Sequence, residues 1–70
     1  MENNKKFILN GYNFCINNDL TIYEILQYFN YQNDLFIVEY NDLISNRNDW
    51  SKIKITSNDK IEIITIVGGG

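Results

Sequence analysis

The chain has 70 residues, a formal net charge of 6 − 9 = −3 and a pI near 4.6. This length allows a single domain, residues 1–70, whose small core leaves little room for the deep cleft of an independent enzyme. The sequence contains no histidine, so it lacks the commonest general base and metal ligand, and its single cysteine excludes an intramolecular disulfide or a cysteine-cluster zinc site. Its six cations are scattered and no apolar run is long enough to span a bilayer, so we expect neither nucleic acid nor a membrane as a partner.

The first predicted element is a β-hairpin. Residues 6–10 read as a strand, and residues 12–17 alternate between apolar and polar side chains. The Asn10-Gly11 pair between them is typical of a type I′ turn, which requires positive φ at both central positions.

A single helix is predicted next, over about residues 22–29. Thr21 and Glu24 have the spacing of a capping box, in which each side chain satisfies a free backbone N–H at the helix start. The apolar residues that follow have helical spacing and define one face, which consists of Ile22, Ile25, Leu26 and Phe29.

The second half of the chain predicts strands separated by turns. Residues 35–40 form a β-branched and aromatic strand, residues 41–42 a turn and residues 43–44 a short strand piece. Residues 45–52 read as an irregular segment anchored by Trp50, on which Arg47 could stack, although contact with a partner is an alternative for both. A turn at residues 57–59 precedes the last strand, residues 60–67, and Asn58 tolerates left-handed backbone there.

This order of elements predicts an α+β fold. One helix must cover one face of a mixed sheet of four or five strands. The ubiquitin-like β-grasp is the compact fold that fits this order in about 70 residues.

The last strand predicts both a core face and a docking face. Ile61 and Ile63 are assigned to the core beneath the helix, which leaves Ile64 and Ile66 on the face that the helix does not cover. Together with Val67 they would form an apolar surface for docking a partner. The alternatives are that loops fold over this surface, or that a central strand is buried on both faces.

The three glycines after this strand are the candidate reactive segment. Gly68 and Gly69 lack side chains, so a flexible tail of residues 67–70 could pass through a narrow channel in another protein. The carboxylate of Gly70 could then be activated as an acyl-adenylate, while an ordinary mobile terminus is the alternative. No catalytic residue is assigned elsewhere, because Cys15 has no histidine to activate it and the acidic residues, among them Asp19 and Asp59 in turns, show no acid/base or metal-ligand spacing.

From about Phe7 to Gly70 the sequence resembles the ThiS family of sulfur carriers of thiamine thiazole biosynthesis. The shared motifs are a strand ending in Asn10-Gly11, a helix beginning T-I-Y-E-I-L at Thr21, a strand leading to Asn41, and an isoleucine, arginine and aromatic at Ile44, Arg47 and Trp50. The closing motif is V-G-G-G at residues 67–70. Two departures are Tyr40, where a basic residue is often found, and Asn58, where glycine usually precedes the aspartate.

The resemblance implies a carrier rather than an enzyme. An E1-like adenylyltransferase of the ThiF type would adenylate Gly70 with ATP, and a sulfur donor such as a cysteine desulfurase would supply the sulfur of a thiocarboxylate. A thiazole synthase of the ThiG type would take that sulfur, and the carrier itself would bind no cofactor or metal. The small subunit of molybdopterin synthase, other sulfur carriers and a ubiquitin-like module that is never activated stay open as alternatives. Both the cytoplasm and the plastid stroma fit as compartments.

Overall fold

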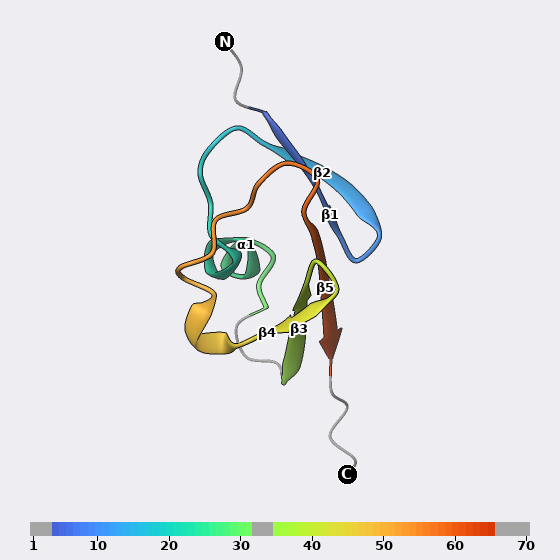
Figure 1. Cartoon of the computed structure of the whole chain (residues 1–70), viewed down its shortest axis with the longest axis vertical. Helices are drawn as coiled ribbons and strands as arrows, with labels where there is room; N and C mark the ends of the chain where they lie inside the picture. Colours follow the sequence, from blue (N-terminus) through green and yellow to red (C-terminus); the bar gives the residue numbers. More distant parts are fainter. Residues whose placement is uncertain (1–3, 32–34, 66–70) are drawn as a thin grey trace.

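The computed structural model describes residues 4–31 and 35–65. In this part of the chain, five strands form one mixed sheet, and a single α-helix packs against one face of it (Figure 1). The strands have the order β2-β1-β5-β3-β4 in the sheet. The elements in chain order are β1 (Lys5–Leu9), β2 (Tyr12–Ile16), α1 (Ile22–Tyr28), β3 (Phe36–Tyr40), β4 (Leu43–Ser45), the 3-10 turn η1 (Arg47–Asp49) and β5 (Lys60–Thr65).

The last strand lies at the centre of the sheet. β5 is parallel to β1 and antiparallel to β3, while the remaining pairs, β1 with β2 and β3 with β4, are antiparallel. This is the ubiquitin-like β-grasp topology, so the predicted fold class is confirmed. It places the carboxyl end of the described chain at the end of a central strand.

Residues with positive φ make the turns where the sequence predicts them. Asn10 and Gly11 have φ of 51° and 84°, and Asn41 and Asp42 have φ of 52° and 71°. Both pairs therefore have the two left-handed residues of a type I′ hairpin turn, whose twist matches that of the flanking strands. Asn58, with φ of 71°, takes the left-handed position before β5.

Helix α1 begins and ends on specific caps. Thr21 Oγ1 accepts a hydrogen bond from Glu24 N at 3.2 Å, and Glu24 Oε1 accepts one from Thr21 N at 2.9 Å, which is the predicted capping box. The helix ends at Tyr28, one residue before the predicted end, because Asn30 adopts a left-handed φ of 64°. Tyr31 N then donates to Leu26 O at 2.8 Å, as in a Schellman motif.

The irregular segment between β4 and β5 holds the start of this helix. Ile22 N donates to Ile53 O at 3.0 Å, and Tyr23 N donates to Trp50 O at 3.1 Å. These backbone N–H groups have no partner inside the helix, so the segment satisfies them from outside. The packing of this segment is therefore set by the helix end as well as by Trp50.

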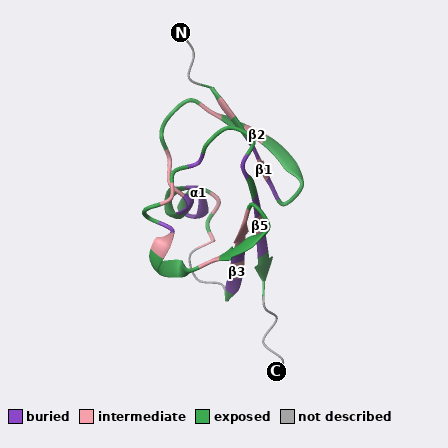
Figure 2. Ribbon diagram, in the orientation of Figure 1, coloured by how far each residue is buried: buried purple, intermediate pink, exposed green. Residues whose placement is uncertain are grey.

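The hydrophobic core lies between α1 and the inner face of the sheet (Figure 2). Trp50 belongs to it, with only 5% of its surface exposed, which agrees with its predicted anchoring role. The buried hydrophobic residues among those described are Phe7, Leu9, Ile22, Ile25, Leu26, Phe36, Val38, Trp50, Ile55, Ile61 and Ile63.

Candidate functional site

The exit of β5 is the part of the structure closest along the chain to the predicted reactive segment. Ile61 and Ile63 are buried beneath α1, and Ile64 is 43% exposed on the opposite face, as predicted. The predicted strand continues to residue 67, whereas the described strand covers Lys60–Thr65. The remaining predicted site residues lie outside the described residues, namely Ile66, Val67, Gly68, Gly69 and Gly70.

An apolar patch adjoins this exit on the face that α1 does not cover. Ile64 of β5 lies opposite Ile37 of β3 in the antiparallel register, and the next row contains Ile44 on β4, Glu39 on β3 and Glu62 on β5. Directly opposed residues of antiparallel strands project from the same face, so these five residues form one surface, which we call the outer-face patch.

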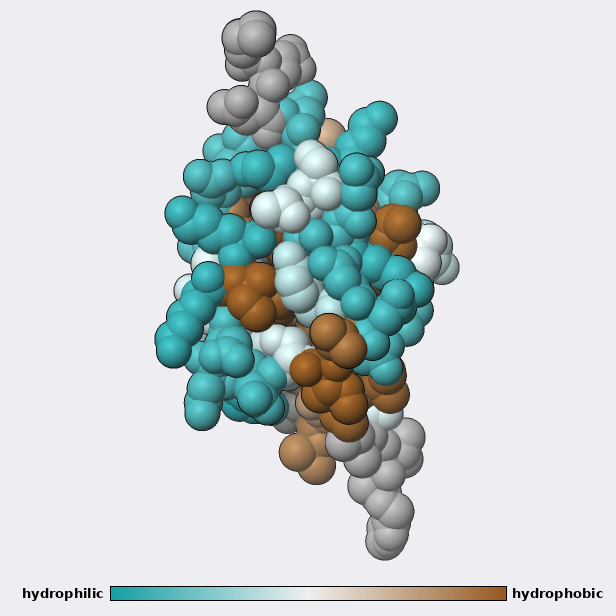
Figure 3. All heavy atoms as spheres, in the orientation of Figure 1, coloured by the Kyte–Doolittle hydropathy of each residue, from teal (hydrophilic) through white to brown (hydrophobic). Residues whose placement is uncertain are grey.

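Two isoleucines of the outer-face patch are exposed to solvent. Ile44 is 69% exposed and Ile64 is 43% exposed, so no loop among the described residues folds over them. Figure 3 shows apolar atoms gathered at the end of the molecule where β5 leaves the sheet. Ile64, the described residue of the predicted docking face, is therefore exposed, whereas its docking role and the contributions of Ile66 and Val67 stay predictions.

The side chain of Asn10 extends the pairing between β1 and β5. The register of these parallel strands covers Ile8 with Lys60 and Leu9 with Ile61, after which the chain turns away into the hairpin. Asn10 Oδ1 accepts a hydrogen bond from Ile63 N at 2.7 Å and so replaces the backbone acceptor that β1 no longer offers. One asparagine thus makes the turn and holds β5 in place.

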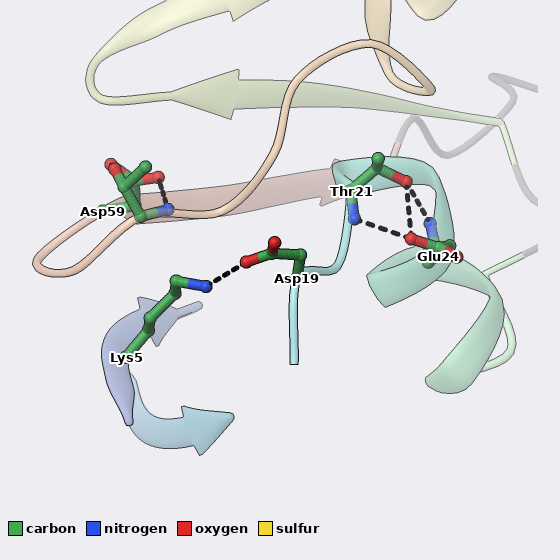
Figure 4. A network of polar contacts seen from close by, with 6 residues as sticks. Lys5, Asp19, Thr21, Glu24 and Asp59 are labelled. Atoms are coloured by element: carbon green, nitrogen blue, oxygen red, sulfur yellow. Dashed lines mark hydrogen bonds and ion pairs between the residues drawn. The ribbon is translucent and has the colours of Figure 1, made fainter. Parts of the chain in front are cut away.

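A buried carboxylate holds the other end of β5. Asp59 is 5% exposed, and it accepts hydrogen bonds from Tyr40 Oη at 2.6 Å, Asn41 Nδ2 at 3.1 Å, Thr56 N at 2.7 Å and Thr56 Oγ1 at 3.0 Å. Figure 4 shows Asp59 in its turn, apart from the Lys5–Asp19 ion pair and the helix cap. The sequence predicts Asp59 only as a turn residue and misses that its side chain joins two turns.

The surroundings of Asp59 and Tyr40 determine the direction in which the pKa of each group is shifted. Burial works to raise the pKa of Asp59, but hydrogen bonds from the Thr56 amide, the Tyr40 hydroxyl, Asn41 and the Thr56 hydroxyl together hold that pKa below its ordinary value. Burial first, and then the hydrogen bond to and the charge of Asp59, raise the pKa of Tyr40. Asp59 is therefore an ionised structural group rather than a proton donor. The hydroxyl of Tyr40 is the donor in this internal contact.

The comparisons with known proteins agree with this arrangement. The model of the ThiS family matches residues 7–70, which is nearly the whole chain. The chain belongs to the ThiS family. A crystal structure of the thiamine biosynthesis protein ThiS from Geobacter metallireducens has the same fold, with a TM-score of 0.78 and 22% identity over 93% of this chain and 99% of that one.

Three relatives of this ThiS-family chain bear the name "Uncharacterized protein ycf40". That of Trieres chinensis is 46% identical over 94% of this chain and 90% of its own length. Those of Pyropia yezoensis and Porphyra purpurea are 31% and 32% identical, each over 89% of this chain and 87% of their own length.

Arg47 of the ThiS-family motif lies in an aromatic stack. The rings of Phe36 and Trp50 are stacked at 5.4 Å with an interplanar angle of 9°, and the Arg47 guanidinium carbon lies 4.9 Å from the Trp50 ring centroid. Trp50 Nε1 donates to Ser45 O at 3.3 Å. The predicted stacking of Arg47 is thus confirmed, while a contact with a partner stays a prediction.

Three other features of the described residues bear on possible functions: the single cysteine, metal-binding clusters and membrane-spanning helices. Cys15 is exposed on the edge strand β2, opposite Lys6 of β1. Across residues 4–31 and 35–65 no group of three or more histidine, cysteine, aspartate or glutamate side chains could hold a metal ion. Within the same ranges, no helix has the length and apolar character needed to cross a bilayer.

Proposed function

We propose that this ThiS-family chain is a sulfur carrier of thiamine thiazole biosynthesis, whose reactive group is the carboxylate of Gly70. The observation that carries the proposal is the family match, which runs from Phe7 through Gly70 and so includes both the sheet and the three glycines. The exit of β5 beside the open outer-face patch supports it, because a partner that binds this patch would be close to where the chain continues toward Gly70.

The proposed chemistry takes place in partner proteins. An E1-like enzyme of the ThiF type joins the Gly70 carboxylate to the α-phosphate of ATP and releases pyrophosphate. A donor such as a cysteine desulfurase provides sulfur as a persulfide, and two electrons from a thiol reductant bring that sulfur to the oxidation level of sulfide. The sulfur displaces AMP from the acyl-adenylate and leaves a thiocarboxylate. A thiazole synthase of the ThiG type takes the sulfur, and water restores the carboxylate. The carrier contributes Gly70 as the modified residue and Gly68 and Gly69 as a segment without side chains, and it binds no cofactor of its own.

Two alternative functions use the same fold. A carrier of the molybdopterin synthase small-subunit type would use the same thiocarboxylate, but that family usually has a longer chain and often a proline before its glycines, whereas this chain has 70 residues and no proline. A ubiquitin-like module that is never activated would need only the folded surface. The ycf40 name of the relatives is consistent with the plastid stroma, the alternative to the cytoplasm as the compartment.

The intact mass of the purified protein tests the proposal. After incubation with a ThiF-type enzyme, ATP and a sulfur donor, we expect a gain equal to the exchange of one oxygen for one sulfur, localised to Gly70. A matched variant with one alanine added after Gly70 keeps the fold but should gain nothing. Thiazole formation with a ThiG-type enzyme then separates the thiamine role from the molybdopterin role. No adenylate and no mass gain, with an enzyme shown to be active on its own carrier, would refute the proposed function.

A further inference from the structure

Two carboxylates oppose each other in the row of the outer-face patch that also contains Ile44. Glu39 of β3 and Glu62 of β5 are direct partners in the antiparallel register. Side chains in such a position have Cβ atoms roughly 4.5–5.5 Å apart, and like charges there destabilise a sheet. Both residues are half-buried, so water screens them less than it would two fully exposed carboxylates. From this rule we expect the pair to cost the isolated fold some stability.

The lysine and arginine residues of the chain form no ion pair with these two glutamates within the described residues. All six lysine and arginine residues lie within the described residues, where the two ion pairs use Asp19 and Asp42. The ammonium of Lys60 donates to Asp42 at 3.0 Å, and its pKa is raised mainly by that contact and less by the charges of Glu62 and Glu39. Neither glutamate has an ion-pair partner among the described residues.

The isoleucines around Glu39 and Glu62 indicate which kind of partner group could compensate the two negative charges. Ile44 lies beside Glu39, and Ile37 and Ile64 form the adjacent row. A partner surface that covers these isoleucines would remove water from the carboxylates and strengthen their attraction for a cation. Arginine suits this position, because its planar guanidinium presents several donors at once and gives up its hydration more readily than an ammonium group does.

We propose that Glu39 and Glu62 together bind one arginine side chain, carried on an apolar surface of the enzyme that activates the tail. This inference rests on the proposed carrier function and adds the chemistry by which the partner is recognised. A second copy of the chain fits less well as the occupant, because its only arginine, Arg47, is stacked on Trp50 on the other side of the sheet and each copy has a net charge of −3. The opposed carboxylates favour an unlike, basic partner.

The test compares three variants with one control. Glu39→Gln, Glu62→Gln and the double variant remove charge from the outer-face patch, whereas Asp49→Asn removes one charge from η1, away from this patch. The dissociation constant for a ThiF-type enzyme is measured at low and high salt, and thermal unfolding of the free protein is measured in parallel. We expect each glutamate variant to weaken binding about 10-fold and the double variant to lose most of the salt dependence. We expect the midpoint of unfolding to rise by about 1–5 °C, because the repulsion is relieved.

The outcomes separate this inference from the proposed function. If the wild-type chain binds the enzyme and gains sulfur while the double variant binds with unchanged affinity, the arginine site is refuted and the carrier role stands. If the wild-type chain is neither bound nor activated, the proposed function fails and the arginine site fails with it. Weaker binding of the Asp49→Asn variant by the same factor would show a general effect of net charge and refute the site. Self-association of the wild type that disappears in the double variant would assign the patch to a second copy instead.

Discussion

Replacing Asp59 with asparagine should destabilise the protein strongly, although the size and shape of the side chain hardly change. Four hydrogen bonds converge on the two carboxylate oxygens, and asparagine keeps only one oxygen. Two donors would then face an NH₂ group instead of an acceptor. A buried donor without a partner costs roughly 1–3 kcal/mol, so the free energy of unfolding should fall by about 3 kcal/mol. In a domain of this size that corresponds to a fall in the unfolding midpoint of roughly 12–24 °C.

The assay is urea unfolding followed by the fluorescence of Trp50, the only tryptophan and a buried one. Tyr40→Phe removes one of the four hydrogen bonds and should cost about 1 kcal/mol. Asp49→Asn makes the same chemical change as Asp59→Asn at a residue outside the network and should stay within about 0.5 kcal/mol. Equal effects of the two aspartate replacements would refute the role given to the network.

The same network sets an expected pH dependence. The pKa of Asp59 is lower in the folded chain than its ordinary value of 3.8, so the contribution of this carboxylate to stability is fully present above that value and is lost as the pH falls through the folded pKa. The wild type should therefore lose stability more steeply below about pH 4 than Asp59→Asn, which has no carboxylate to protonate. Parallel pH profiles of unfolding free energy would contradict this reasoning.

Further predictions concern positions whose roles are separable. Asn10→Gly keeps the positive φ but removes the acceptor for the Ile63 amide. In urea unfolding, it should lower the free energy of unfolding by about 1–2 kcal/mol more than Asn58→Gly does, because Asn58 is a left-handed residue without that contact. Thr21→Ala removes the helix cap and should lower the unfolding free energy by about 1 kcal/mol in the same assay. Ile61→Val, in the core, should cost about 1 kcal/mol, and the same change at exposed Ile44 less than about 0.5 kcal/mol.

The features that could be predicted from the sequence are those that depend on neighbours along the chain. The Asn10-Gly11 turn and the Thr21–Glu24 capping box each need only residues up to three positions apart, and both are found as predicted. The alternation that places Ile61 and Ile63 inside and Ile64 outside is equally local.

The contacts that could not be predicted join distant residues. Asn10 and Ile63 are 53 positions apart, and Tyr40 and Asp59 are 19 apart. No local pattern distinguishes an asparagine that only turns the chain from one that also accepts a hydrogen bond from β5. The opposed pair of Glu39 and Glu62 depends on the register between β3 and β5, which periodicity alone does not determine.

The pairing between β1 and β5 ends at Ile61, so the two halves of β5 differ in their backbone partners. Up to Ile61 the strand has a backbone neighbour on each side, whereas beyond that point β1 has turned away and only β3 continues, with its register reaching Thr65. The final residues of β5 thus belong to a central strand by position and to an edge strand by hydrogen bonding. Beyond Ile63, whose amide donates to Asn10 Oδ1, the described part of β5 has backbone pairing with β3 alone. A partner that binds the chain there could add backbone hydrogen bonds on the other side without first displacing any strand of the carrier.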